Sequence, residues 1–518
     1  MTGRANRRGA AVLALAGAVT MVVASCSSGP GGGTADPDGV LRVGYSLSAV
    51  GTRLDPVQST AATDSVWMSP VFGTLLRQQA DGSLDPWMAE SVEVVDPQTV
   101  RISLRDGTTF ADGTPYDAEA IKVSLMRARA APTPLAQASQ TQVLRVIDGV
   151  EVVDPTTAVV RLSQPLAGQL LVELSQRGGM IVSPRQVAEN PAEINTKPVG
   201  AGPFRVAEYV PDRSVVYDKN PAYWDAAGVE LGGVEFVDTP RGGQQANGLL
   251  SGTLDVAPLV TLDSIDTIEA SGFATNKTPG PVVNLVMCTG KAPFDNEDVR
   301  KAVQVGIDRQ RFADVAYGGH VDPATSFTPD SSTQFNPRTQ ELLAFDLGRA
   351  RQLLAESGLT ETSFELHYPA PVADLAPAAD VIQSQLKAIG FNATVVADRD
   401  VNAAFMAVQT PGMMITPVFT TGLDLFSRHL TPGSPYALCG VGRPDVMDFV
   451  NQAYALDPAD PAAVEAVQKA QELMAEHAYV IPVSTYPIVA SWSEDRIGDS
   501  PKFTSDGFIQ LDSVQLTR

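Results

Sequence analysis

Short stretches in which apolar and polar residues alternate run along the chain, and they predict strands buried on one face. The first begins at Val40, where VLRVGY alternates over its whole length. Further strands are predicted over 92–95, 100–104, 158–162, 204–206, 214–217, 234–237, 282–287, 391–396 and 479–483. Apolar residues at helical spacing predict helices over 65–78, 117–126, 295–303, 346–356, 379–389 and 460–474. Helix followed by strand indicates α/β construction.

Residues suited to helix ends support these boundaries. Candidate N-caps precede three of the predicted helices: Asp117, Asp295 and Asp460. Pro461 follows Asp460 at the first helical position, where its missing N–H is harmless. Glycines that can take a left-handed backbone stand where three helices should stop: Gly252, Gly358 and Gly390.

The stretch 197–224 combines several backbone signals. Gly200 and Gly202 bracket Ala201, so the backbone can pass where a Cβ would clash. Two short predicted strands follow, separated by the turn pair Pro211-Asp212. Asn220-Pro221 ends the second strand, and Tyr223-Trp224 is predicted to be a large apolar anchor.

This stretch resembles the G-[TS]-G-P-[YF] … N-P-x-Y-W signature of the family 5 extracytoplasmic solute-binding proteins. These are the peptide-, dipeptide- and nickel-binding receptors of ABC importers. Ala201 stands where the family usually has Thr or Ser, so a hydrogen bond from that hydroxyl is lost here. Other segments are also similar to family patterns: 81–91, 104–118, 249–256 and 293–309.

The resemblance implies a two-lobed periplasmic-binding-protein-like α/β fold of type II, with an extra inserted domain and a hinge between the lobes. Lobe I is expected to comprise 40–71, 197–285 and 482–518, with 72–196 as its inserted domain. Lobe II is expected to comprise 286–481. In the similar family, 197–224 is where the chain returns to its first domain.

The N-terminus predicts a targeting segment. Three arginines precede an apolar run over 10–23 that is too short to span a bilayer comfortably. Val23-Ala24-Ser25-Cys26 resembles the lipobox of bacterial lipoproteins, which implies cleavage after residue 25 and lipidation of Cys26; an ordinary signal peptide is the alternative. The Gly-rich segment 26–39 is then a flexible tether.

Two cysteines remain besides Cys26. Outside the cytoplasm Cys288 and Cys439 either form a disulfide or are two separate buried thiols.

The net charge of −22 disfavours contact with nucleic acid, and no basic patch with interleaved aromatic residues occurs. The chain has no P-loop, H-E-x-x-H, C-x-x-C or G-x-S-x-G motif, and its four histidines are not at metal-ligand spacing. We therefore expect no cofactor, no metal and no enzymatic activity.

The segment 419–426 takes the place of a family loop, W-x-x-D-Y-x-D-P, whose acidic residue pairs with the α-ammonium of bound peptides. The resemblance implies this contact for Asp424, flanked by Thr421 and Gly422. The loop lacks the Trp and has Leu425 in place of Pro, so Asp424 is equally well a cap of a helix over 426–430.

Three further residues are candidate solute contacts. Arg428 would bind a carboxylate end or face solvent. Trp492 matches a region where relatives place an aromatic residue near the cleft, with core packing as the alternative. Asn284 lies on the apolar strand 282–287, a candidate crossing between the lobes.

The expected function is capture of a solute by hinge closure and delivery to an ABC permease. Peptide is the first expectation, and a nickel chelate, a sugar, haem or a lipid-like solute are alternatives. A secreted hydrolase or a chaperone-like scaffold is the alternative outside transport. We expect a monomer, lipid-anchored on the outer face of the cytoplasmic membrane.

Overall fold

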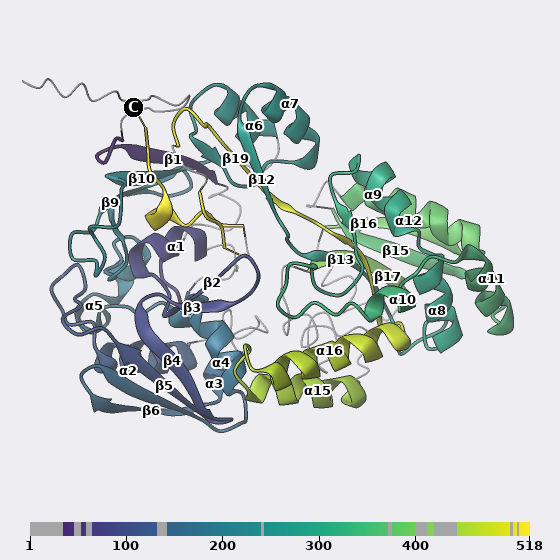
Figure 1. Ribbon diagram of the computed structural model, residues 1–518, viewed down its shortest axis with the longest axis horizontal. Coiled ribbons are helices and arrows are strands. Elements are labelled where there is room, and N and C mark those ends of the chain that lie inside the picture. Colours follow the sequence, from purple (N-terminus) through teal and green to yellow (C-terminus); the bar gives the residue numbers. More distant parts are fainter. Residues whose placement is uncertain are drawn as a thin grey trace, which may run out of the picture.

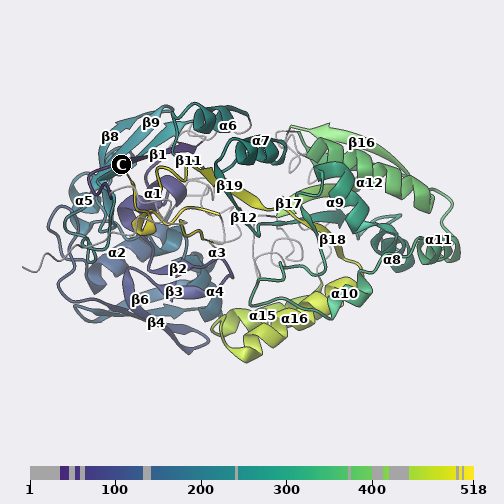
Figure 2. The same ribbon diagram turned by 45° about the horizontal axis from the view of Figure 1, so that its top comes forward.

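The computed structural model describes residues 35–45, 53–58, 65–131, 142–239, 243–370, 375–399, 412–418, 443–497, 501–504 and 507–517. These residues form two lobes, each built around its own large sheet (Figure 1). Extended segments cross between the lobes, and the rotated view in Figure 2 shows the same arrangement.

A seven-stranded mixed sheet organises the first lobe, in the order β12-β19-β11-β1-β10-β9-β8. The alternating stretch that begins at Val40 forms β1 at its centre, parallel to both β10 and β11. The strands are β1 Val40–Tyr45, β8 Phe204–Val210, β9 Ser214–Lys219, β10 Gly233–Asp238, β11 Val256–Ala257, β12 Ala274–Thr278 and β19 Ile488–Trp492. Helices α6 Gly243–Leu250 and α7 Ile265–Ala270 pack beside this sheet. Three distant parts of the sequence therefore share one sheet.

The segment 72–196 contributes an antiparallel sheet of its own, in the order β4-β5-β7-β6. Its strands are β4 Ala89–Asp96, β5 Thr99–Leu104, β6 Ile147–Asp154 and β7 Thr157–Leu162, and a hairpin pairs β2 Leu76–Gln78 with β3 Leu84–Pro86. The helices of this segment are α2 Ala118–Arg129, α3 Gln142–Arg145, α4 Ala167–Leu174 and α5 Pro184–Glu189. That 72–196 is a domain inserted into the first lobe stays a prediction.

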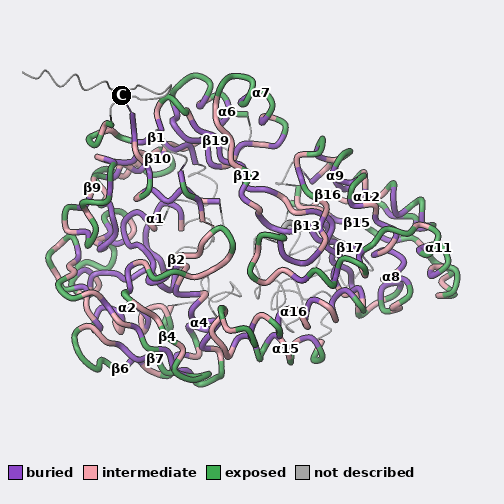
Figure 3. The backbone as a smooth tube through the Cα atoms, viewed as in Figure 1, coloured by how far each residue is buried: buried purple, intermediate pink, exposed green. Residues whose placement is uncertain are grey.

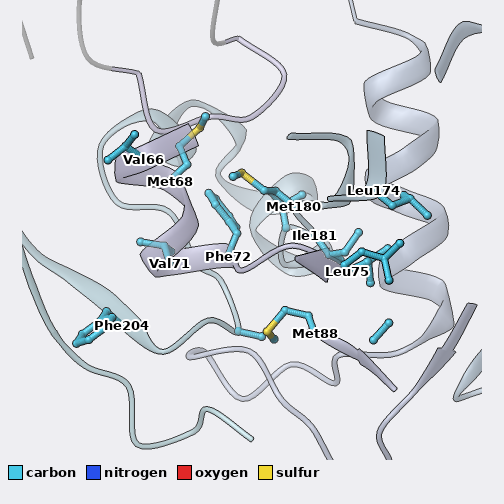
Figure 4. Close-up of a cluster of buried hydrophobic side chains, with 14 of the residues drawn as sticks. Val66, Met68, Val71, Phe72, Leu75, Met88, Leu174, Met180, Ile181 and Phe204 are labelled. Atoms are coloured by element: carbon cyan, nitrogen blue, oxygen red, sulfur yellow. The ribbon is translucent and has the colours of Figure 1, made fainter. Parts of the chain in front are cut away.

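Helix α1, Ser65–Phe72, joins the two sheets of the first lobe in one apolar core. Figure 4 shows side chains of this core, which come from α1 itself and from segments far apart in the sequence: Val66, Met68, Val71, Phe72, Leu75, Met88, Leu174, Met180, Ile181 and Phe204. Removing this apolar surface from water is the main favourable contribution to folding of the lobe.

The glycines of the 197–224 stretch fit against the end of α1. Gly202 donates its N–H to the carbonyl oxygen of Val71 at 2.7 Å, and a Cβ on Gly200 would overlap that same oxygen. The amide of Asn220 donates to the carbonyl of Gly202 at 2.8 Å. The predicted need for residues without a side chain is confirmed, and its cause is close approach of two backbones.

A six-stranded mixed sheet organises the second lobe, in the order β14-β18-β13-β17-β15-β16. Its strands are β13 Val282–Met287, β14 Asp322–Pro323, β15 Ser363–Pro369, β16 Asn392–Asp398, β17 Gly412–Val418 and β18 Val480–Thr485. Strand β13 is buried along its whole length, as the purple tube in Figure 3 shows. The predicted apolar crossing strand is thus a central strand of this sheet.

Two groups of helices cover the second sheet. Helices α8 Glu297–Gly306, α9 Arg309–Tyr317, α11 Leu347–Glu356 and α12 Leu375–Ile389 belong to one core cluster, and the short α10 Thr339–Leu342 lies beside α16. Helices α15 Pro444–Ala455 and α16 Pro461–Glu476 pack on each other and on Val286 and Val480 in a separate cluster.

Within the described residues the chain crosses between the lobes twice, from β12 to β13 and from β18 to β19. The two crossings touch: the N–H of Tyr486 donates to the carbonyl of Pro281 at 2.8 Å. A Cβ on Gly280 would overlap the carbonyl oxygen of Tyr486, so the segments pass at backbone contact. Strands β13 and β18 lie wholly in the second sheet, whereas the expected lobe boundaries at 285/286 and 481/482 fall inside these two strands.

Several predicted helix ends are confirmed. Asp117 and Asp460 are N-caps whose carboxylates accept backbone N–H groups at 3.0 and 2.8 Å. Gly252 and Gly358 have positive φ after their helices. The predicted cap Asp295 is wrong, because the amide oxygen of Asn296 accepts from the first turn of α8 instead.

Two other local predictions need correction. The helix predicted over 65–78 ends at Phe72, because Gly73 takes a positive φ of 61° and 76–78 pair as β2. Of the predicted anchor pair, Tyr223 is buried, whereas Trp224 is 41% exposed and stacks under the guanidinium of Arg105 at 4.0 Å.

Candidate functional site

Asn284 lies in the middle of β13 with no exposed surface. Its amide nitrogen donates to the carbonyl of Val282 at 2.7 Å, which fixes the orientation of the side chain. Its amide oxygen has no hydrogen-bond partner among the described residues. Side chains alternate along a strand, so Asn284 shares a face with Val286 and is turned away from the core that contains Leu285.

Ser484 provides a second buried polar atom on the neighbouring strand β18. It has no exposed surface, and its hydroxyl has no partner within the described part of the chain. The register places Ser484 opposite Val283, where a bulge shifts the pairing by one residue before Asn284. A buried polar group without a partner costs about 1–3 kcal/mol, so two on adjacent strands point to a role beyond folding.

Both polar groups lie beside the crossing segments. Asn284 follows Pro281 by three positions, and Ser484 precedes Tyr486 by two. The hydrogen bond between Tyr486 and Pro281 joins the two crossing segments. Asn284 and Ser484 lie just on the second-lobe side of this hydrogen bond. A group held here is close to the axis about which the two lobes can move relative to each other.

Aromatic residues gather on the first-lobe side. The rings of Tyr45 and Trp67 meet edge to face at a centroid distance of 5.1 Å, and Tyr45 meets Phe508 at 6.3 Å. Trp492, at the end of β19, packs on Phe503 at 5.9 Å and is 7% exposed. These contacts make Trp492 a core residue of the seven-stranded sheet, and a solute contact by it stays a prediction.

Sequence reasoning missed Ser484, Tyr45 and Trp67. The indole N–H of Trp67 is buried and has no partner among the residues described, so it resembles the polar atoms of Asn284 and Ser484. No sequence signal marks such residues, because a Ser in a strand or a Trp in a short helix is most often ordinary core or surface. Only the absence of a hydrogen-bond partner among the described residues distinguishes Ser484 and Trp67.

Several predicted residues fall outside the described ranges: Cys26, Thr421, Gly422, Asp424, Arg428 and Cys439. Their roles stay predictions. Cys288 is described, and it is buried and disulfide-bonded.

Histidines in the described ranges pair with acids. The Nδ1 of His367 lies 2.6 Å from Asp398, and the Nδ1 of His477 lies 3.1 Å from Glu297. The described residues contain no group of three side chains suited to hold a metal ion. Within these ranges no helix is long and apolar enough to cross a membrane.

Residues 83–423 match the model of the bacterial extracellular solute-binding proteins, family 5 Middle. The chain belongs to this family. Among curated proteins it is similar to the glutathione-binding protein GsiB of Escherichia coli strain K12, with 25% identity over 96% of this chain and 97% of the relative. The GsiB of Shigella dysenteriae serotype 1 is 25% identical over 93% of this chain and 94% of its own length.

Solved structures show the same fold. The ABC transporter substrate-binding protein CtaP of Listeria monocytogenes aligns with a TM-score of 0.78 at 20% identity, over 93% of this chain and 100% of that one. The unliganded open form of MppA, a periplasmic murein tripeptide binding protein, aligns with a TM-score of 0.76 at 19% identity, over 94% and 99% of the chains. NikA of Brucella suis, in complex with Fe(III)-EDTA, aligns with a TM-score of 0.77 at 20% identity, over 91% and 99%. The two-lobed binding-protein fold expected from the sequence is confirmed.

Proposed function

We propose that this family 5 solute-binding protein captures a peptide outside the cytoplasmic membrane and delivers it to an ABC permease. The names of its relatives support this solute class, since GsiB is glutathione-binding and MppA is murein tripeptide binding. Glutathione and murein tripeptide share amide N–H groups, carboxylates and a free amine. The site of this chain should therefore offer acceptors for N–H groups and for an ammonium group.

The observation that carries the proposal is the buried amide oxygen of Asn284, an acceptor with no partner among the described residues. Its own amide nitrogen is already engaged with Val282, so only a donor from elsewhere satisfies the oxygen. A peptide N–H is such a donor. The hydroxyl of Ser484 on the next strand can donate or accept, and so complements either side of a peptide group.

The proposed receptor closes its two lobes over the solute. Lobe I would comprise 40–71, 197–281 and 486–518 with the inserted domain 72–196, and lobe II would comprise 282–485, because β13 and β18 belong to the second sheet. Asp424 would pair with the α-ammonium group of the peptide, with Thr421, Gly422, Arg428 and Trp492 nearby. A nickel chelate, a sugar, haem or a lipid-like solute in the same role is the alternative.

The proposal includes a monomer held at the outer face of the membrane by lipid on Cys26. The family is extracellular, which supports this location. Cleavage before Cys26 would leave the segment 26–39 as a tether. A tether of this length lets the receptor reach a permease in the same membrane.

Native mass spectrometry of the purified protein, followed by calorimetry with the solute it identifies, tests the proposal. A co-purified solute with at least one peptide bond is expected, and a solute without one would overturn the peptide assignment. Asn284→Ala should then weaken binding about 5- to 150-fold, because a donor buried without its acceptor costs about 1–3 kcal/mol. The matched control is Asn392→Ala, at an exposed position on β16. Equal affinities of the two variants would show that Asn284 does not contact the solute.

A further inference from the structure

The two lobes also meet at a second place, between α4 of the inserted segment and the end of α15. A Cβ on Gly168, in the first turn of α4, would overlap the carbonyl oxygen of Leu456, and it would lie 3.2 Å from the carbonyl oxygen of Ala453. Leu456 is the C-cap of α15. Backbone therefore lies directly on backbone, which only glycine allows.

Leu166 adds an apolar contact at the same place. This residue precedes α4 and packs both against the core cluster of the first lobe and against the cluster formed by α15 and α16. A single partly buried side chain thus belongs to the cores of both lobes. Separating the lobes here would expose its apolar surface to water.

A hydrogen bond between two turns adds to this contact. The N–H of Thr333 donates to the carbonyl of Asp81 at 3.1 Å. The carboxylate of Asp81 accepts from the N–H and the hydroxyl of Ser83 at 2.9 and 2.7 Å, which fixes the turn that presents this carbonyl. Gly82, with a φ of 85°, completes the turn.

The loop that carries Thr333 is fastened to α16. The amide of Asn336 donates to the carbonyl of Gln468 at 2.8 Å. Gln468 and Gln471 donate in return to the carbonyls of Phe335 and Gln334, at 2.9 and 3.0 Å. Both interlobe contacts therefore come from one part of the second lobe, the α15–α16 pair and the loop hydrogen bonded to it.

The crossing strands and the α4–α15 contact lie at opposite ends of the boundary between the lobes in both Figure 1 and Figure 2. Two bodies joined along one edge by crossing strands can rotate apart only if contacts on the opposite edge break. The contacts at Gly168, Leu166 and Thr333 use groups of this chain alone, so no solute group takes part in them.

We propose that Gly168–Leu456 and Asp81–Thr333 form an interlobe latch, and that Gly168 is its positioning residue. The latch favours the closed arrangement through the chain's own contacts, so the solute completes a closure that is already partly stabilised. The apparent affinity for a solute rises in proportion to the fraction of molecules in the binding-competent state. By raising that fraction before the solute arrives, the latch raises the apparent affinity. This inference goes beyond the proposed peptide binding and does not depend on which solute the protein takes.

Spin-label distances measured on purified protein without added solute test the latch. The labels are placed on Glu119→Cys in α2 and Gln352→Cys in α11, which are exposed positions on the two lobes. Gly168→Ala should shift the distance distribution outward and raise the open fraction about tenfold, because the new Cβ pushes α4 away from α15. The matched control is Gly149→Ala in β6, where a Cβ meets nothing within 4 Å. Identical distributions for these two variants would overturn the proposal.

A second measurement keeps the test decisive if Gly168→Ala fails to fold. Ala80→Cys and Thr333→Cys are exposed positions at the backbone contact between Asp81 and Thr333, and they leave the Asp81 carboxylate in place, so a short bifunctional thiol reagent should join them in high yield without added solute. The control pairs Thr333→Cys with Asp154→Cys, at the exposed end of β6. If the first pair gives no more cross-linked product than the second, the latch proposal is overturned.

Discussion

The guanidinium of Arg309 lies against the backbone of strand β18, with its Nε 2.8 Å from the carbonyl oxygen of Pro482. Its Nη1 donates to the carbonyl of Leu343 at 2.6 Å. Burial lowers the pKa of Arg309 to about 10, because the charged form loses its hydration. No carboxylate within the described ranges pairs with it, so backbone carbonyls offset the cost of the buried charge. Arg309 thus ties the start of α9 to the strand that leaves the second lobe.

Arg309→Lys should lower the free energy of unfolding by about 3 kcal/mol, because one ammonium group cannot reach the carbonyls that the planar guanidinium spans. Urea unfolding followed by circular dichroism measures the change. Arg351→Lys is the control. Like Arg309, Arg351 donates to backbone, here to the single carbonyl of Ala388, but it lies on an exposed surface. Its change should stay within about 0.5 kcal/mol. Equal losses in both variants would contradict a special role for Arg309.

Asp112 should stabilise the first lobe only above acidic pH. Burial raises the pKa of this carboxyl, but hydrogen bonds from Thr114 and Ser183 outweigh it and hold the pKa below its ordinary value of 3.8. A lowered pKa in the folded state gives stability that is present above the unfolded value and is lost as pH falls through the folded one. Asp112→Asn should therefore cost about 1–2 kcal/mol at pH 7 and progressively less below about pH 4.

Chemical unfolding over a pH series measures this dependence. Asp106→Asn, on an exposed turn, serves as the control and should shift stability little at any pH. A loss in Asp112→Asn that is the same at pH 7 and at pH 3 would show that the residue acts through packing alone.

The disulfide of Cys288 should close on Cys439. Peptide mapping of unreduced, alkylated protein should yield one cross-linked pair that contains both residues and no alkyl group on either. Cys439→Ser should lower the free energy of unfolding by about 2–4 kcal/mol, since the bridge restricts the unfolded chain. Alkylated Cys439 in the unreduced protein would contradict this pairing.

Lipid on Cys26 should hold the protein at the membrane. Cys26→Ala should block processing or release the protein into the soluble fraction, because the modified thiol is the only proposed anchor. Ser27→Ala keeps the cysteine and should sediment with membranes like the parent. Membrane sedimentation of a processed Cys26→Ala variant would refute the anchor.

Asp424 should hold the amine of the bound peptide. Asn at this position removes the charge and keeps the shape, so Asp424→Asn should weaken binding of an amine-bearing solute roughly thirtyfold to a few thousandfold, the equivalent of about 2–5 kcal/mol. Calorimetry with the identified solute measures it, with Asp448→Asn on the exposed side of α15 as control. Unchanged affinity would mean that Asp424 caps a helix.

Local features were decided by the sequence itself. The N-caps at Asp117 and Asp460 and the stops at Gly252 and Gly358 follow from hydrogen bonds and φ angles that involve only a few neighbouring residues. Alternation located β1 and the hairpin of β8 and β9 for the same reason, since the side-chain period belongs to the strand alone. The family signatures then supplied the two-lobed fold.

Long-range packing decided the rest. Arg42 and Asp255, far apart in the sequence, meet in an ion pair at 2.8 Å because β1 and β11 are neighbours, and no local pattern fixes that order. The amide oxygen of Asn284 is buried because β17 and β18 enclose β13, and no described residue bonds to it. In the sequence Gly168 is like any other helical glycine, and only the tertiary structure places the carbonyl of Leu456 from the other lobe against it. Sequence sets what each residue can bond to nearby, whereas tertiary structure alone sets which distant groups reach it.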